Sequence, residues 1–260
     1  MTNANESLVP IRDFQLFVKT ISPSKSSKKT TIFLHDSLGC TTLWRDFPQR
    51  YMALTGDDVV VYDRRGYGQS TPYPPDETRT IDYMAKEAEV LHELLDQLDI
   101  ESCSLFGHSD GATIALLAAA QKPNRIQQVI IEGPHIYVES ITREGVHAAS
   151  VAYATTDLKQ RLQKYHGDRT DAMVHAWTST WLSDFYQQWN VTSQLPAITC
   201  PVLAFQGEAD EFGTAQQVWD IQQHVSGECE VVLIPEIGHT PHKECPDFVL
   251  SHLEGYFGKG

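Results

Sequence analysis

Short apolar runs alternate along this chain with longer segments of helical spacing. The apolar runs cover 31–34, 58–62, 103–106, 129–131, 202–205 and 231–234, and helical spacing marks 42–54, 81–98 and 112–120. This order is typical of parallel strands that are joined by crossover helices. The segment 14–21 alternates residue by residue, which predicts an edge strand. The sequence therefore predicts the α/β class, with a mostly parallel, twisted sheet flanked by helices.

The region 134–196 interrupts this order because it contains no strand pattern. A stretch of this length rarely forms a plain loop inside a compact domain. We therefore expect a helical cap insertion at 134–196 and a core formed by 1–133 and 197–260. The insertion contains the aromatic residues Trp177, Trp181, Phe185, Tyr186 and Trp189. Two interpretations stay open, since these rings could line a pocket or pack the interior of the insertion, and packing is the commoner outcome.

The charge of the chain limits its partners. The 260 residues have a formal net charge of −14, whereas binding to nucleic acid needs concentrated lysine and arginine. No apolar run is long enough to predict a transmembrane helix, and the opening residues lack the pattern of a signal peptide. We therefore expect a cytoplasmic protein with no nucleic-acid partner and no membrane partner.

The cysteines predict neither a disulfide framework nor a zinc site. They are odd in number, scattered and without a C-x-x-C pair, at Cys40, Cys103, Cys200, Cys229 and Cys245. Such spacing is not that of a metal or disulfide scaffold. We expect no metal and no organic cofactor.

One serine lies where a strand is expected to turn sharply into a helix. The segment from Gly107 to Gly111 reads G-x-S-x-G around Ser109, between the apolar run 103–106 and the helical segment 112–120. A turn of this kind exposes the serine hydroxyl at the edge of the sheet and needs small flanking residues. We therefore predict that Ser109 is a nucleophile; the simpler alternative is a serine that only caps the helix.

A serine needs a base and an orienting acid, and both follow later strands. Asp210 follows the run 202–205, and His239 follows the run 231–234. The order serine, acid, histidine predicts Asp210 as the acid and His239 as the base. Glu132, which ends another predicted strand, is a rival for the acid. His242 could form an H-x-x-H metal pair with His239, but no cluster of carboxylates or cysteines completes such a site.

The negative charge that develops on an attacked carbonyl needs two backbone N–H donors. Asp110 follows the nucleophile and supplies the first predicted donor. The second is expected from the loop after the run 31–34, where Ser37 is the best candidate. That loop could equally be a simple turn closed by an aspartate side chain.

Four separated motifs resemble the α/β-hydrolase fold-1 family over about residues 14–258. They are HDSLG from His35, DRRGYGQS from Asp63, GHSDG around Ser109, and GEAD with IGHTPH at Asp210 and His239. The set is similar to the biphenyl-hydrolase-like, or valacyclovirase-like, branch. The family usually has His-Gly in the first motif, and here Asp36 replaces that glycine, which puts the Ser37 donor in doubt.

The resemblance implies a hydrolase that cleaves a small carboxylic ester, thioester or lactone through an acyl-enzyme on Ser109. The partner is then a small ester-like molecule. An alternative is hydrolysis of a carbon–carbon bond or an enol lactone with the same three residues. A non-catalytic receptor built on this fold is a third possibility, because fold alone does not set function. Asp110 could also hold the ammonium group of an amino-acid ester, although its side chain could equally be structural.

Overall fold

The computed structural model describes residues 3–25, 27–74 and 78–258, and the outermost residues of the predicted core ranges lie outside these limits. Within them the chain forms an eight-stranded sheet in the order β1-β2-β4-β3-β5-β6-β7-β8. The strands are β1 (Asn3–Ile11), β2 (Phe14–Ser22), β3 (Thr30–Leu34), β4 (Asp58–Tyr62), β5 (Cys103–His108), β6 (Ile126–Glu132), β7 (Val202–Gly207) and β8 (Cys229–Ile234). The predicted α/β class with a mostly parallel sheet is confirmed.

The prediction of an edge strand at 14–21 is wrong. The strand exists as β2, but β1 pairs with it along its full length in antiparallel register, from Asn3 opposite Ser22 to Ile11 opposite Phe14. On its other side β2 pairs antiparallel with β4. Seven of the nine residues of β1 are exposed, and only Val9 and Ile11 are buried. A strand with so little apolar alternation gives no periodic signal, so the sequence pattern missed it.

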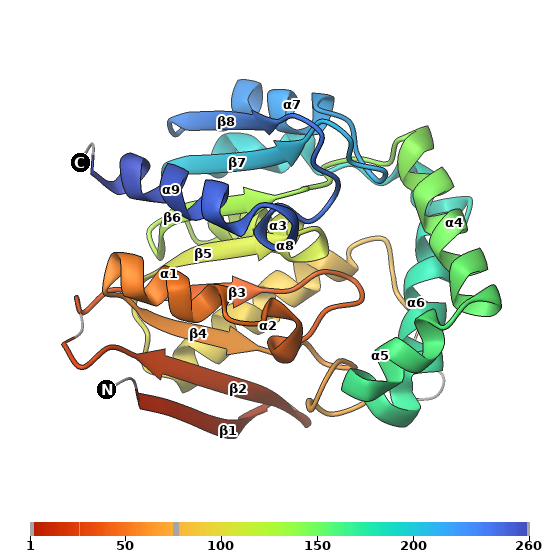
Figure 1. Ribbon diagram of the computed structural model, residues 1–260, viewed down its shortest axis with the longest axis horizontal. Helices are drawn as coiled ribbons and strands as arrows, with labels where there is room; N and C mark the ends of the chain where they lie inside the picture. Colours follow the sequence, from red (N-terminus) through yellow and green to blue (C-terminus); the bar gives the residue numbers. More distant parts are fainter. Residues whose placement is uncertain (1–2, 26, 75–77, 259–260) are drawn as a thin grey trace.

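Helices cover both faces of the sheet, as predicted (Figure 1). One apolar layer joins α1 and α9 to the side chains of one face. A second layer packs α2, α3 and α7 on the other face. The ranges are α1 (Phe47–Thr55), α2 (Tyr83–Gln97), α3 (Asp110–Gln121), α7 (Gln216–His224), α8 (Pro241–Glu244) and α9 (Pro246–Phe257), with the short 3₁₀ turn η1 (Thr41–Trp44).

The segment between β6 and β7 is helical and lies beyond the carboxyl ends of the parallel strands (Figure 1). It contains α4 (Ser140–Thr155), α5 (Leu158–His166), η2 (Gly167–Arg169), α6 (Thr170–Leu182), η3 (Phe185–Gln188) and η4 (Thr192–Ala197). A single antiparallel bridge joins Tyr137 to Asn190 near its base. The division into a core and a cap at 134–196 stays a prediction.

Within the described residues, no helix combines the length and the apolar character that a membrane crossing requires.

Candidate active site

Ser109 sits at a strained turn between β5 and α3. Its backbone has φ 56° and ψ −120°, a region that side chains rarely adopt and that requires support from the surrounding structure. A Cβ atom on Gly107 would lie 2.4 Å from the carbonyl oxygen of Gly111, and one on Gly111 would lie 2.1 Å from that of Leu34. The two glycines are therefore required by backbone that cannot move aside, as the motif predicted.

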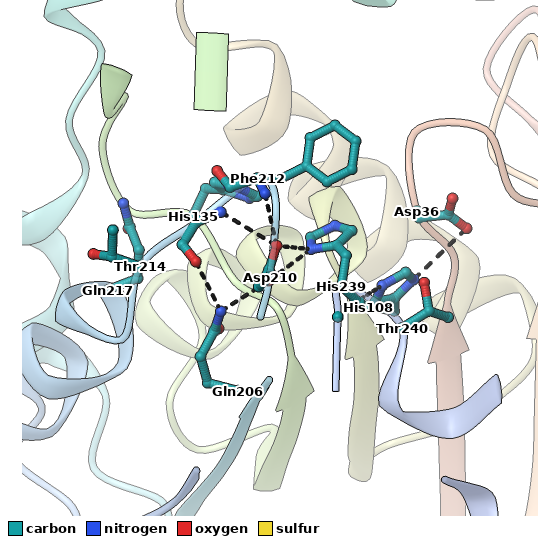
Figure 2. A network of polar contacts seen from close by, with 12 residues as sticks. Asp36, His108, His135, Gln206, Asp210, Phe212, Thr214, Gln217, His239 and Thr240 are labelled. Atoms are coloured by element: carbon teal, nitrogen blue, oxygen red, sulfur yellow. Dashed lines mark hydrogen bonds and ion pairs between the residues drawn. The ribbon is translucent and has the colours of Figure 1, made fainter. Parts of the chain in front are cut away.

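His239 and Asp210 form a buried pair. The Nδ1 atom of His239 lies 2.8 Å from one carboxylate oxygen of Asp210 and 3.0 Å from the other. Asp210 also accepts hydrogen bonds from the side chain of Gln206 at 2.8 Å and from the backbone N–H of Phe212 at 2.8 Å. Figure 2 shows these contacts meeting at the Asp210 carboxylate. The structure thus brings the predicted acid and base together from the loops that follow β7 and β8.

The charges of the pair support each other. Burial raises the pKa of Asp210, but the charge of His239 and the hydrogen bonds outweigh burial and lower that pKa to about 2. Burial lowers the pKa of His239, whereas the charge and hydrogen bond of Asp210 raise it, and the net shift is upward. Asp210 is therefore ionised at neutral pH, and His239 is a stronger base than an isolated histidine.

One cavity of about 150 Å³ joins the predicted site residues. Ser109, His239, Asp110 and Ser37 all line it, while Asp210 lies behind His239. Loops at the carboxyl ends of the strands form its floor and α4 and α6 form its roof. The full lining is Asp36, Ser37, Leu38, His108, Ser109, Asp110, His135, Thr142, Val146, Trp177, Trp181, Glu211, Phe212, His239 and Thr240.

The loop after β3 is both a turn and a wall of the cavity. The backbone N–H of Leu38 donates to the Asp36 carboxylate at 3.4 Å, and that of Gly39 donates to the Asp36 carbonyl at 3.2 Å. These contacts engage the N–H groups that follow Ser37. The N–H of Asp110 is the first of α3 and has no acceptor within that helix. The positions of Ser37 and Asp110 are compatible with two donors facing the cavity, and their role stays a prediction.

The rival acid Glu132 contacts a different histidine. Its carboxylate lies 2.6 Å from Nδ1 of His242 and accepts the backbone N–H of His242 at 3.3 Å. Burial raises the pKa of Glu132 to about 7. His239 is therefore paired with Asp210 and not with Glu132. Across the described residues no group of three histidine, cysteine or acidic side chains could hold a metal ion.

Some aromatic residues of the insertion line the cavity, and others pack the interior of the insertion. Trp177 and Trp181 line the cavity. Tyr186 and Trp189 stack on each other with ring centroids 5.3 Å apart and pack the interior. Phe185 is about half exposed.

Sequence reasoning missed three polar residues of the site. His108 links two loops, since its Nε2 atom donates to the carbonyl of His239 at 2.8 Å and its Nδ1 atom lies 3.8 Å from Asp36 (Figure 2). His135 lines the cavity, and Gln206 holds Asp210. His108 is the first variable residue of the G-x-S-x-G motif, directly before Ser109. This position in the motif was the signal that could have identified it.

A family model described as serine aminopeptidase, S33, matches residues 25–246, which is most of the chain. The chain belongs to this family of α/β-hydrolases. The predicted α/β-hydrolase fold is confirmed.

Relatives of this chain include the serine hydrolases BPHL of Homo sapiens and Mus musculus, each 31% identical to it. The matched regions cover 73% of this chain and 65% of each relative, so the chain spans less than two thirds of their length. A 2-hydroxy-6-oxononadienedioate/2-hydroxy-6-oxononatrienedioate hydrolase of Cupriavidus pinatubonensis is 26% identical over 71% of each chain.

Solved structures agree on the fold. A 2-hydroxy-6-oxo-6-phenylhexa-2,4-dienoate hydrolase from Rhodococcus sp. strain RHA1 superposes with a TM-score of 0.83, 16% identity and 99% coverage of both chains. A proline iminopeptidase from Mycobacterium smegmatis superposes with a TM-score of 0.71, 19% identity and 98% coverage of both chains. At these identities the likeness establishes the fold alone.

Proposed function

We propose that this hydrolase cleaves a small carboxylic ester through an acyl-enzyme intermediate on Ser109. The observation that carries the proposal is the His239–Asp210 pair in the wall of the cavity that Ser109 also lines. A serine hydroxyl is nearly inert at neutral pH unless a base removes its proton. In the His239–Asp210 pair, His239 is the base. The Asp210 carboxylate orients its ring and raises its pKa.

The proposed reaction has two steps. The Ser109 oxygen attacks the ester carbonyl while His239 takes the hydroxyl proton, and the charge of Asp210 stabilises the resulting imidazolium. The N–H groups of Ser37 and Asp110 donate hydrogen bonds to the carbonyl oxygen and stabilise the negative charge that develops on it. His239 then returns its proton to the departing alcohol. A water activated by His239 releases the carboxylic acid and restores Ser109.

The charge of the cavity favours an ester over the alternative carbon–carbon substrate. Asp36, Asp110 and Glu211 line the cavity, and among the described residues its lining includes no lysine and no arginine. A dienoate, as named for the relative from Rhodococcus, carries a carboxylate that Asp36 and Glu211 would repel, whereas the charge of Asp110 is balanced by Arg64. The proposed ester is therefore neutral or cationic next to its carbonyl.

Asp110 is the acidic group that could hold an ammonium. One of its oxygens accepts from the Tyr83 hydroxyl at 3.2 Å and lies 3.5 Å from Arg64. Within the described residues, its other oxygen is buried without a hydrogen-bond partner. A substrate ammonium would provide that partner. Comparison of an amino-acid ester with its N-acetylated form tests this role, and equal rates would argue against it.

The experiment is a hydrolysis screen with p-nitrophenyl esters of increasing acyl length, amino-acid esters and a ring-opened diketone. Ser109→Ala is assayed beside the wild type. The matched control is Ser102→Ala, which changes the serine directly before the first residue of β5, at the opposite end of the strand from Ser109. We expect ester turnover that Ser109→Ala lowers by several orders of magnitude and that Ser102→Ala leaves unchanged.

Other outcomes of the screen have a definite meaning. Ester turnover that survives in Ser109→Ala would overturn the acyl-enzyme. Turnover of the diketone without turnover of esters would assign the alternative carbon–carbon reaction. Failure to react with a fluorophosphonate probe, together with no turnover, would favour the non-catalytic receptor.

A further inference from the structure

We propose that Glu132 is a positioning residue that fixes the catalytic histidine relative to the nucleophile. The inference rests on the proposed function, because it assigns His239 as the base and Ser109 as the nucleophile. Glu132 itself lies outside the cavity lining. Glu132 is the last residue of β6. Its backbone carbonyl contacts the N–H of Ser109, and its carboxylate contacts His242.

The backbone of Glu132 holds the nucleophile. Its carbonyl oxygen accepts the N–H of Ser109 at 2.9 Å. In the parallel register of β5 and β6, Glu132 lies opposite His108, the residue before Ser109. The strained turn is therefore anchored to β6 through this residue.

The carboxylate of Glu132 holds the loop that carries the base. It contacts both the ring and the backbone N–H of His242, three residues after His239. The Glu132 side chain is completely buried, and that of His242 is 2% exposed. The His242 ring also packs against Trp44 and Phe47, with centroids 4.4 and 5.6 Å away. Both polar and apolar contacts thus fix the start of α8, which directly follows the loop that carries His239.

The next residue of the same strand end supports the ring of His239. Gly133 has φ +54°, and a Cβ atom there would lie 2.8 Å from Cε1 of His239 and 2.9 Å from Nδ1. His108 additionally binds the carbonyl of His239. The end of β6 therefore contacts both partners of the proposed proton transfer.

A positioning role accounts for a group that is costly to bury. A carboxylate removed from water destabilises the fold unless it is well paired, and an apolar pair of similar shape often serves stability equally well. Proton transfer, in contrast, is sensitive to displacements of about 1 Å, which can lower a rate by about 100-fold. Replacing the Glu132–His242 pair by apolar residues should therefore lower the rate of the reaction while changing the stability of the fold little.

The test compares three variants with the wild type. Glu132→Gln keeps an acceptor for His242, the double variant Glu132→Met/His242→Phe removes the polar contact but keeps the volume, and Gly133→Ala presses on the His239 ring. The measurements are kcat and KM for p-nitrophenyl acetate, the rate of fluorophosphonate labelling of Ser109, and the thermal midpoint. Glu230→Gln, which alters the partly exposed Glu230–His252 pair, is the matched control.

We expect the double variant and Gly133→Ala to lose about 10- to 100-fold in kcat and in labelling rate, with little change in KM. Glu132→Gln should retain most of the rate, and Glu230→Gln should match the wild type. A folded double variant with the kcat and labelling rate of the wild type would overturn the proposal. If the double variant does not fold, the single variant His242→Phe, which removes the contact with the Glu132 carboxylate, takes its place, and an unchanged kcat and labelling rate in it would also overturn the proposal.

Failure of this inference is distinguishable from failure of the proposed function. If Ser109→Ala abolishes ester turnover while Gly133→Ala and the double variant keep it, the acyl-enzyme stands and Glu132 has no positioning role. If Ser109→Ala keeps the turnover, the proposed function itself is wrong.

Discussion

Asp210 is 5% exposed, and its carboxylate would be costly to bury alone. Three donors besides His239 satisfy it, namely the Gln206 amide and the backbone N–H groups of Phe212 and Gly213. These contacts hold the carboxylate in place, so that its charge stabilises a protonated His239. The geometry of the acid–base pair therefore depends on the hydrogen bonds that hold the Asp210 carboxylate.

The Asp210→Asn variant should lose roughly 10⁴-fold in kcat, because a neutral amide neither fixes the histidine tautomer nor stabilises the imidazolium. The measurement is steady-state hydrolysis of p-nitrophenyl acetate, with a thermal melt to show that the variant is folded. Glu208→Gln, an exposed acid two residues away, is the matched control and should retain full activity. A folded Asp210→Asn variant with activity within about tenfold of the wild type would contradict the assignment.

The pH dependence of kcat/KM should report the pKa of His239 in the free enzyme. His239 must be deprotonated to accept the Ser109 proton, so activity rises with pH through that pKa. Since Asp210 raises this pKa above the ordinary value of 6.5 for histidine, the rise should be centred above pH 6.5. In Asp210→Asn the residual activity should rise at a lower pH. A rise centred at the same pH in both proteins would argue against the coupling.

Two elements meet at the nucleophile, and their close approach depends on glycine. Gly107, the residue before the end of β5, packs against the first turn of α3, while Gly111 in α3 packs against the backbone at the end of β3. The strained backbone of Ser109 is maintained because strand and helix are both held by the sheet.

Gly111→Ala should lower the free energy of unfolding by about 1–3 kcal/mol, since the added methyl meets backbone and cannot be accommodated by a side-chain rotation. Chemical denaturation measures the change. Gly255→Ala in α9 is the control, because a Cβ atom there meets nothing within 4 Å. This control should stabilise the protein by about 0.5–1 kcal/mol. Equal effects of the two variants would contradict the packing argument.

In the whole molecule, the cavity exists because α4 and α6 cover the carboxyl ends of the parallel strands (Figure 1). Its volume of about 150 Å³ matches that of cavities that accept a ligand of benzene size. We therefore expect the roof to limit the size of the acyl group and the floor to supply the proposed chemistry.

Trp177→Leu should shift the preference of the enzyme towards longer acyl groups, because it removes aromatic volume from the roof and keeps an apolar surface. The measurement is the ratio of kcat/KM for p-nitrophenyl octanoate to that for the acetate, which should rise by about tenfold. Trp219→Leu on α7 is the control, since Trp219 is 38% exposed and lies outside the cavity lining. An unchanged ratio in Trp177→Leu would show that the roof does not limit acyl length.

The sequence by itself determined the α/β class, the turn at Ser109 and the strand ends that carry Asp210 and His239. These features follow from local patterns, namely apolar runs, helical spacing and glycines beside a serine. Strand β1 escaped this reasoning because its polar residues are held by pairing with β2 and not by burial.

The tertiary structure alone decided which acid meets which histidine. Glu132 ends β6 and Asp210 lies in the loop after β7, and both were candidates on sequence grounds. Their partners depend on the loop between β8 and α8, which brings His239 to Asp210 and His242 to Glu132. It also decided that Trp177 faces the cavity while Trp189 packs inside, because the fold of the insertion sets the direction of each ring. Such pairings join residues distant in the chain, and no local pattern encodes them.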